Sequence, residues 1–108
     1  MKESRTFYES LGKRVLETVK PADVPQERKN RINYCQAWYN EVYVDGRPII
    51  AIRSYNTIVA FLDIYTDCLV SLGRYSITTY QHVRKYRNNY CPNMWNTSEI
   101  NVELVNWF

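Results

Sequence analysis

The sequence contains 108 residues, of which 45% are hydrophobic and 23% are charged, a balance typical of one globular domain and unlike that of a disordered chain. Its three Gly and four Pro residues exclude collagen-like and low-complexity classes. The formal net charge of +3 at pH 7 is too small to require a nucleic-acid partner.

The first predicted element is an amphipathic helix that begins after Ser4 and ends before Pro21. Four apolar residues recur at every fourth position and form its buried stripe: Phe7, Leu11, Val15 and Val19. Serine is a common helix N-cap, and proline cannot continue a helix. Gly12 lies inside this helix at a cost of about 1 kcal/mol, which indicates a close neighbour on that face.

A second helix is expected to begin at Pro25, because the missing N–H of proline costs nothing in the first turn. Its buried stripe consists of Ile32, Cys35 and Tyr39. One observation opposes this helix. Its first turns contain Arg28 and Lys29, and positive charge near a helix start gains nothing from the helix dipole.

From residue 42 onward the pattern changes to that of β-strands. Residues 42–44 and 48–52 are rich in β-branched side chains and flank Asp45-Gly46, a typical hairpin turn. Further strands are expected at residues 57–62 and 68–72. The short connections predict an antiparallel meander of three to four strands, since parallel pairing requires a long crossover.

A further helix is expected over residues 76–88, with Thr78 as its N-cap and Gln81 completing a capping box. Three side chains are expected to face the sheet: Tyr75, Val83 and Tyr86. Three cations are expected to remain exposed: Arg84, Lys85 and Arg87.

The apolar tail, residues 89–108, would form a large hydrophobic patch if it were exposed. We therefore expect it to pack on the domain, to add a strand, or to meet a partner, which includes a second copy in a homodimer. These elements predict a single α+β domain over residues 1–108. It has N-terminal helices in 4–40, a sheet in 42–72, and the helix 76–88 packed on that sheet.

Two segments resemble a known pattern. Residues 54–60 read SYNTIVA and residues 75–82 read YSITTYQH. They are similar to small uncharacterised proteins of phages and mobile elements that show S-Y-x-T-x-V-A on a strand and Y-S-x-T-T-x-x-H at a helix start. The similarity covers residues 49–86. It implies a phage or prophage context, in which many small proteins bind a host or defence component, and it carries over no catalytic residue. Both segments also make sense as purely structural motifs.

Cysteine usage and hydropathy bear on the compartment. Cys35, Cys68 and Cys91 form no CxxC pair and cannot complete a zinc site with the one histidine, so no metal or cofactor is expected. They are typical of reduced thiols in a cytosolic protein. No signal peptide or membrane-spanning run is recognisable. We expect a cytoplasmic protein without a membrane partner, in the host cytoplasm if it is encoded by a phage.

Few residues favour catalysis. His82 is the one group suited to acid–base work near neutral pH, and a small nuclease using it is the third functional hypothesis. Asp63 and Asp67 are explained by turn polarity, unless a tight turn brings them together around a divalent cation. Phosphate-binding glycine loops are absent from the sequence. No catalytic residue is therefore assigned.

The remaining signal is a mixture of cations and aromatic rings in residues 68–91, which carry +4 and no acidic residue. We expect six of these residues to bind a partner: Arg74, Tyr80, Arg84, Lys85, Arg87 and Tyr90. A solvated helix face is the plainer explanation.

The leading hypothesis is a non-enzymatic binding protein of phage or mobile-element type. It would inhibit, stoichiometrically, a host nucleic-acid-handling defence complex, in the manner of an anti-CRISPR protein. Its partner is a host protein or ribonucleoprotein. The alternative is a small regulator that binds nucleic acid directly, since cations and rings together are what single-strand binders use.

Overall fold

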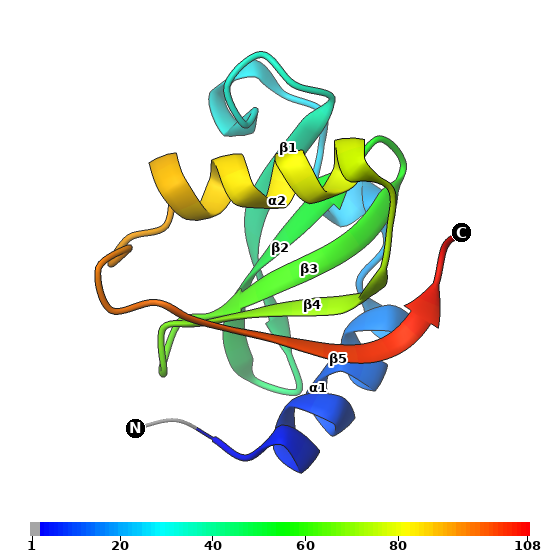
Figure 1. The fold of residues 1–108 in the computed structure, drawn as a ribbon, viewed down its shortest axis with the longest axis vertical. Coiled ribbons are helices and arrows are strands. Elements are labelled where there is room, and N and C mark those ends of the chain that lie inside the picture. Colours follow the sequence, from blue (N-terminus) through cyan, green and yellow to red (C-terminus); the bar gives the residue numbers. More distant parts are fainter. Residues whose placement is uncertain (1–2) are drawn as a thin grey trace.

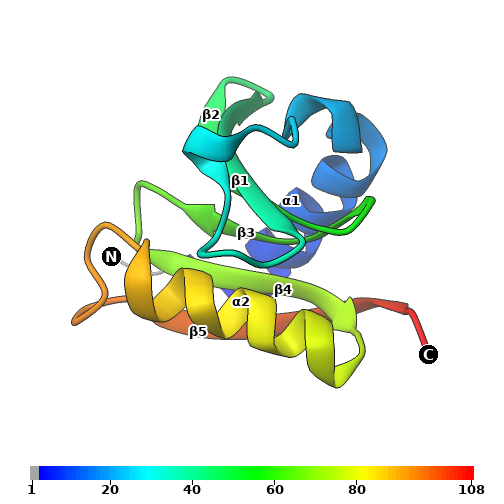
Figure 2. The same cartoon turned by 90° about the horizontal axis from the view of Figure 1, so that it is seen from above.

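A computed structural model describes residues 3–108 as a five-stranded sheet with one helix on each face (Figure 1, Figure 2). The helices are α1 (Arg5–Thr18) and α2 (Ile77–Asn89), and the strands are β1 (Ala37–Val44), β2 (Arg47–Ser54), β3 (Thr57–Asp63), β4 (Cys68–Arg74) and β5 (Ser98–Asn106). The α+β class is thus confirmed. Neither of these helices is long and apolar enough to cross a membrane.

The sheet is mixed, with strand order β1-β2-β3-β4-β5. Strands β1 to β4 form the predicted antiparallel meander, including the hairpin turn at Asp45-Gly46, but β5 pairs parallel to β4. The sheet therefore differs from the prediction in having a fifth strand and in the parallel pairing of that strand. Of the expected fates of the apolar tail, the structure shows an added strand. Strand β5 can pair parallel to β4 because the 13 residues of α2 provide the long crossover that parallel pairing needs.

The predicted second helix is wrong. Residues 21–36 instead contain two single turns of 3-10 helix, Pro21–Asp23 and Arg28–Asn30, and β1 begins at Ala37. Tyr39 of the expected helical stripe therefore lies in a strand. Pairing of β1 with β2 over eight residues outweighs the weak helical pattern. In addition, the dipole of the expected helix would have been unfavourable for the cations near its start.

The sheet is buried on both faces. On one face, α1 buries Tyr8, Leu11 and Val15 and packs against β1, β4 and β5. On the other face, α2 packs Val83 and Tyr86 against the sheet. The predicted stripe of α1 is confirmed at Leu11, Val15 and Val19, whereas Phe7 is half-buried. The Ser4 N-cap is also confirmed, because its Oγ accepts a hydrogen bond from Phe7 N at 3.1 Å.

Two glycines allow β5 to pack where it does. A Cβ at Gly73 would lie 1.8 Å from the carbonyl oxygen of Val105, because the register of β4 and β5 shifts at this point. A Cβ at Gly12 would lie 2.9 Å from Leu104 Cδ1. The close neighbour expected beside Gly12 is therefore β5, and backbone contact at Gly73 excludes every side chain.

Helix α2 confirms the predicted helix, but its N-cap is Ser76 and not Thr78. Ser76 Oγ accepts a hydrogen bond from Thr79 N at 3.3 Å. The helix begins at Ile77, earlier than a cap at Thr78 would allow. Ser76 takes the cap because it is the last residue in extended conformation before that start.

Candidate binding surface

The structure divides the six predicted partner-binding residues among three places. Two line a groove between α2 and β5: Arg74 and Tyr80. Two form ion pairs with β5: Arg84 and Arg87. Two contact the loop that precedes β1: Lys85 and Tyr90. These residues therefore do not act as one continuous surface.

Glu99 of β5 neutralises part of the basic block. Arg84 Nη1 lies 3.1 Å from both of its carboxylate oxygens, and Arg87 Nε lies 3.3 Å from Oε2. The Arg87 side chain is 22% exposed, so the expectation that it remains exposed is wrong. The physical reason is the parallel pairing of β5 with β4, which brings an acidic residue beside α2.

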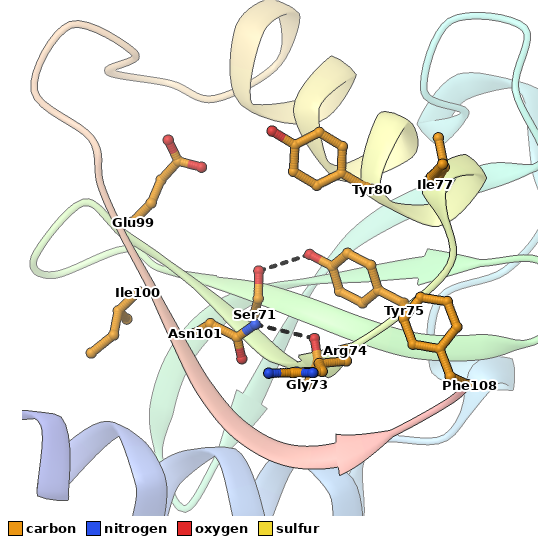
Figure 3. Close-up of a pocket in the computed structure, with 10 residues that line it drawn as sticks. All are labelled: Ser71, Gly73, Arg74, Tyr75, Ile77, Tyr80, Glu99, Ile100, Asn101 and Phe108. Carbon is orange, nitrogen blue, oxygen red and sulfur yellow. Dashed lines mark hydrogen bonds between the residues drawn. The ribbon is translucent and has the colours of Figure 1, made fainter.

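The groove between α2 and β5 has a volume of about 470 Å³ and is shown in Figure 3. Its floor is held by a hydrogen bond of 2.9 Å between Ser71 Oγ and the Tyr75 hydroxyl, and burial raises the pKa of that tyrosine. Ile77 is exposed at its rim. Arg74 and Glu99 both line it, so their charges offset one another and the groove does not favour an anion.

A second cavity, of about 770 Å³, has a different character. We call it the basic cavity and define it by its lining: Gln26, Arg28, Lys29, Arg31, Asn33, Tyr34, Trp38 and Tyr90. Three of these residues are cations and none is acidic. The sequence did not predict this cavity, because its helical pattern places Arg28 and Lys29 in a helix. The signal that could have found it is the run Arg-Lys-Asn-Arg at residues 28–31.

The back wall of the basic cavity is held rigidly. Arg31 Nε donates to the carbonyl oxygen of Cys35 at 2.7 Å, and its guanidinium lies 5.7 Å from the centre of the Trp38 ring. The backbone N–H of Asn33 donates to the Tyr90 hydroxyl at 2.7 Å, and that hydroxyl donates to Asn33 Oδ1 at 3.1 Å. These two hydrogen bonds hold Asn33, whose φ is 50°. Tyr90, at the end of α2, therefore anchors the loop that precedes β1.

The front of the basic cavity is open. The ring of Tyr34 is 95% exposed. Arg28 is exposed and forms no ion pair among residues 3–108, and Lys29 is 81% exposed with its Nζ 3.8 Å from Glu27. On the neighbouring turn of α2, Lys85 Nζ lies 3.2 Å from Cys35 Sγ. Cations that face solvent therefore surround an uncovered aromatic ring.

The segments 54–60 and 75–82 meet in space. Ser54, at the end of β2, lies 2.8 Å from His82 Nδ1 and 3.1 Å from Thr79 Oγ1, and all three side chains are buried. The contacts join the β2–β3 turn to α2, which is a structural role. Burial, aided by Lys85, lowers the pKa of His82. His82 is only 5% exposed, so its placement gives the nuclease hypothesis no support.

Asp63 and Asp67 also have structural partners. Asp63 is fully buried and receives two hydrogen bonds from the Arg47 guanidinium, at 2.8 and 3.1 Å. Asp67 accepts from Asn93 Nδ2 at 3.1 Å. Across the described part of the chain, no three His, Cys, Asp or Glu side chains gather as a metal site would require. The open alternative of a divalent cation between Asp63 and Asp67 thus gains no support.

Comparison with known proteins gives one match. A model of a family of unknown function, DUF8033, matches residues 22–101. This region contains the basic cavity, the sheet up to the middle of β5, and α2, and it leaves out α1. No curated protein and no solved structure matches the chain.

Proposed function

The chain belongs to the DUF8033 family, whose function is unknown, and we propose that it is a non-enzymatic binding protein for an anionic partner. The observation that carries this proposal is the basic cavity. Three cations and an exposed ring surround an opening of about 770 Å³ that contains no acidic lining residue. The groove between α2 and β5 pairs a cation with an acid instead.

Charge is the main argument for an anionic partner. Arg28, Lys29 and Arg31 lie within four residues, and Glu27, 3.8 Å from Lys29 Nζ, offsets one of these charges. Lys85 adds a cation at Cys35 of the same loop, 3.2 Å from its Sγ. The mutual repulsion of these cations costs free energy in the unbound protein, and a ligand of opposite charge relieves it. A concave positive surface also raises the local concentration of anions and the rate of association.

The proposal extends to the kind of partner. Nucleic-acid-handling complexes of a host cell present phosphates and acidic protein faces, which are what the basic cavity would bind. The resemblance of residues 54–60 and 75–82 to phage and mobile-element proteins favours such a target. The protein would then act by occupying the complex stoichiometrically, as an anti-CRISPR protein does.

Binding to two polyanions, poly-glutamate and a mixed nucleic acid, tests the anionic partner. The double variant Arg28→Gln/Lys29→Gln removes the two open cations. The charge-matched control Arg5→Gln/Lys13→Gln removes two exposed cations of α1. We expect the parent and the control to bind at least one polymer and the double variant to lose that binding. Equal binding by the double variant, or no binding by the parent, contradicts the proposal.

The proposed inhibition of a host complex has its own test. The tagged parent and the Arg28→Gln/Lys29→Gln variant are incubated with a lysate of the host, and the captured complex is identified. We expect the parent to retain a nucleic-acid-handling complex and the variant to release it. Host defence that is unaltered by expression of the protein, together with an empty capture, argues against inhibition.

A further inference from the structure

We propose that the ligand of the basic cavity is a single-stranded nucleic acid, with one base stacked on Tyr34 and the flanking phosphates on Arg28, Lys29 and Arg31. This inference rests on the proposed function and names its partner. It begins from a feature that charge alone does not explain, which is the ring of Tyr34, 95% exposed among cations.

Tyr34 is the ring in the basic cavity that is free to stack. Trp38 is 5% exposed and carries two guanidinium groups, from Arg31 at 5.7 Å and Arg53 at 5.5 Å. Tyr90 packs on Tyr39 with their ring centres 5.4 Å apart, and its hydroxyl is held by Asn33. Aromatic platforms for bases need an uncovered face, and Tyr34 provides one.

The cations are placed to follow a backbone. Arg28 and Lys29 lie on the short 3-10 turn, and Arg31 follows it at the back wall. The Arg31 Nε atom is engaged by Cys35, while no hydrogen bond or ion pair of its terminal nitrogens is found in residues 3–108. Three cations within one cavity match about three consecutive phosphates. Lys85 of α2, next to Cys35, provides a further positive charge.

The shape favours a single strand over a duplex. A cavity of about 770 Å³ lies in the size range of ligand pockets, which suits an unpaired nucleotide. In a duplex the bases are stacked inside and cannot reach Tyr34. Poly-glutamate would use the cations but has no ring or apolar side chain to place on an aromatic face. The Tyr34 ring therefore distinguishes the single strand from the other two polyanions.

The experiment measures binding by fluorescence anisotropy for three labelled probes: a thymidine oligonucleotide of about 12 nucleotides, a duplex of equal length, and poly-glutamate. We expect the single strand to bind tightest. Tyr34→Ala should weaken its binding at least about 5-fold, the lower bound for loss of one stacked base. Tyr34→Phe keeps the ring and should restore the affinity. Tyr43→Ala removes an exposed tyrosine of β1 and should have no effect.

Salt dependence provides a second readout. Three phosphate contacts predict a slope of about −2 for the logarithm of affinity against the logarithm of salt concentration. The Arg28→Gln/Lys29→Gln variant should reduce this slope by about 1.4, or about 0.7 for each lost contact.

The outcomes separate the two proposals. If the duplex binds as tightly as the single strand and Tyr34→Ala has no effect, the single-strand inference is wrong while the anionic-partner function stands. Tightest binding of poly-glutamate also overturns the single-strand inference and indicates an acidic protein as the partner. If the parent binds none of the three probes, both proposals are wrong. Melting curves of each variant verify that it is folded.

Discussion

The carboxylate of Asp63 is fully buried, and it accepts hydrogen bonds from other side chains and from the backbone N–H of Tyr65. It accepts from the Arg47 guanidinium and from the Tyr8 hydroxyl, the latter at 2.8 Å. Burial alone would raise the pKa of Asp63, but hydrogen bonds from Arg47, Tyr8 and Thr66 outweigh it and hold the pKa below its usual range. The Arg47 guanidinium in turn lies over the rings of Phe7 and Tyr65. This cluster therefore ties α1 to β2 and to the β3–β4 turn.

Replacing this carboxylate tests the stabilising role of the cluster. Asp63→Asn removes the buried ionic partner of Arg47 and leaves its guanidinium with the partly exposed Glu3, 3.6 Å away. It should lower the free energy of unfolding by about 3 kcal/mol at neutral pH. Asp67→Asn, an acid-to-amide change in the same turn, should have a much smaller effect. Urea unfolding of both variants and the parent measures the difference.

The pH dependence has a defined sign. Because the folded pKa of Asp63 is lower than its unfolded value, its contribution is fully present above the unfolded pKa of about 3.9. The contribution is lost as pH falls through the folded value. The stability gap between the parent and Asp63→Asn should therefore narrow as the pH falls from about 4 through the lower folded pKa. A gap that stays constant over this range would contradict the account of Asp63.

At the scale of elements, the position of β5 depends on the glycines of its neighbours. Gly73→Ala places a Cβ 1.8 Å from the Val105 carbonyl oxygen. Backbone must move to relieve this contact, so we expect a loss of about 3 kcal/mol of stability and faster hydrogen exchange in β5. Gly12→Ala meets side-chain atoms only: Leu72 Cδ2 at 3.2 Å, Val102 Cγ2 at 3.4 Å and, nearest, the end of the Leu104 side chain at 2.9 Å. That chain can rotate, and alanine favours the helix by about 1 kcal/mol.

Urea midpoints and amide exchange rates of the two glycine variants check this prediction. The same chemical change is made in both, so the comparison isolates backbone contact from side-chain contact. If Gly73→Ala and Gly12→Ala have equal effects on stability and on exchange in β5, the close approach of β4 and β5 is not the reason that position 73 requires glycine.

Elements with strong local patterns could be predicted from the sequence, and elements that depend on distant partners could not. Helix α1 and the hairpin at Asp45-Gly46 follow from periodicity and turn chemistry. Strand β1 was missed over its first residues because its pairing with β2 competes with a helical stripe. An added strand was one of three options for the tail, but its parallel pairing was not predicted, since no local signal specifies pairing with β4 across 13 residues of helix.

At the scale of the whole molecule, the candidate site could be predicted only in part. The mixture of cations and rings was recognised, and Tyr90 does line the basic cavity. Arg84 and Arg87 were expected to be free, yet Glu99 of β5 pairs with both of them across the turn that follows α2. The basic cavity combines residues 26–38 with Tyr90 at the end of α2. Such a combination exists only after the chain folds.

The groove between α2 and β5 and the basic cavity are therefore differently charged, and the central claim is that the basic cavity is the one that binds. The groove between α2 and β5 provides the natural internal comparison, because its lining contains one cation and one acid. A method that reports on every residue at once can decide between the two openings without any substitution.

Titration of isotope-labelled protein with the single-stranded oligonucleotide, followed by amide NMR spectra, is that measurement. The account predicts that the largest shifts of the amide signals occur at residues 28–34 and around Tyr90, the lining of the basic cavity. Shifts centred on Ile77 and Tyr80 of the groove, or shifts spread evenly over the surface, would contradict it.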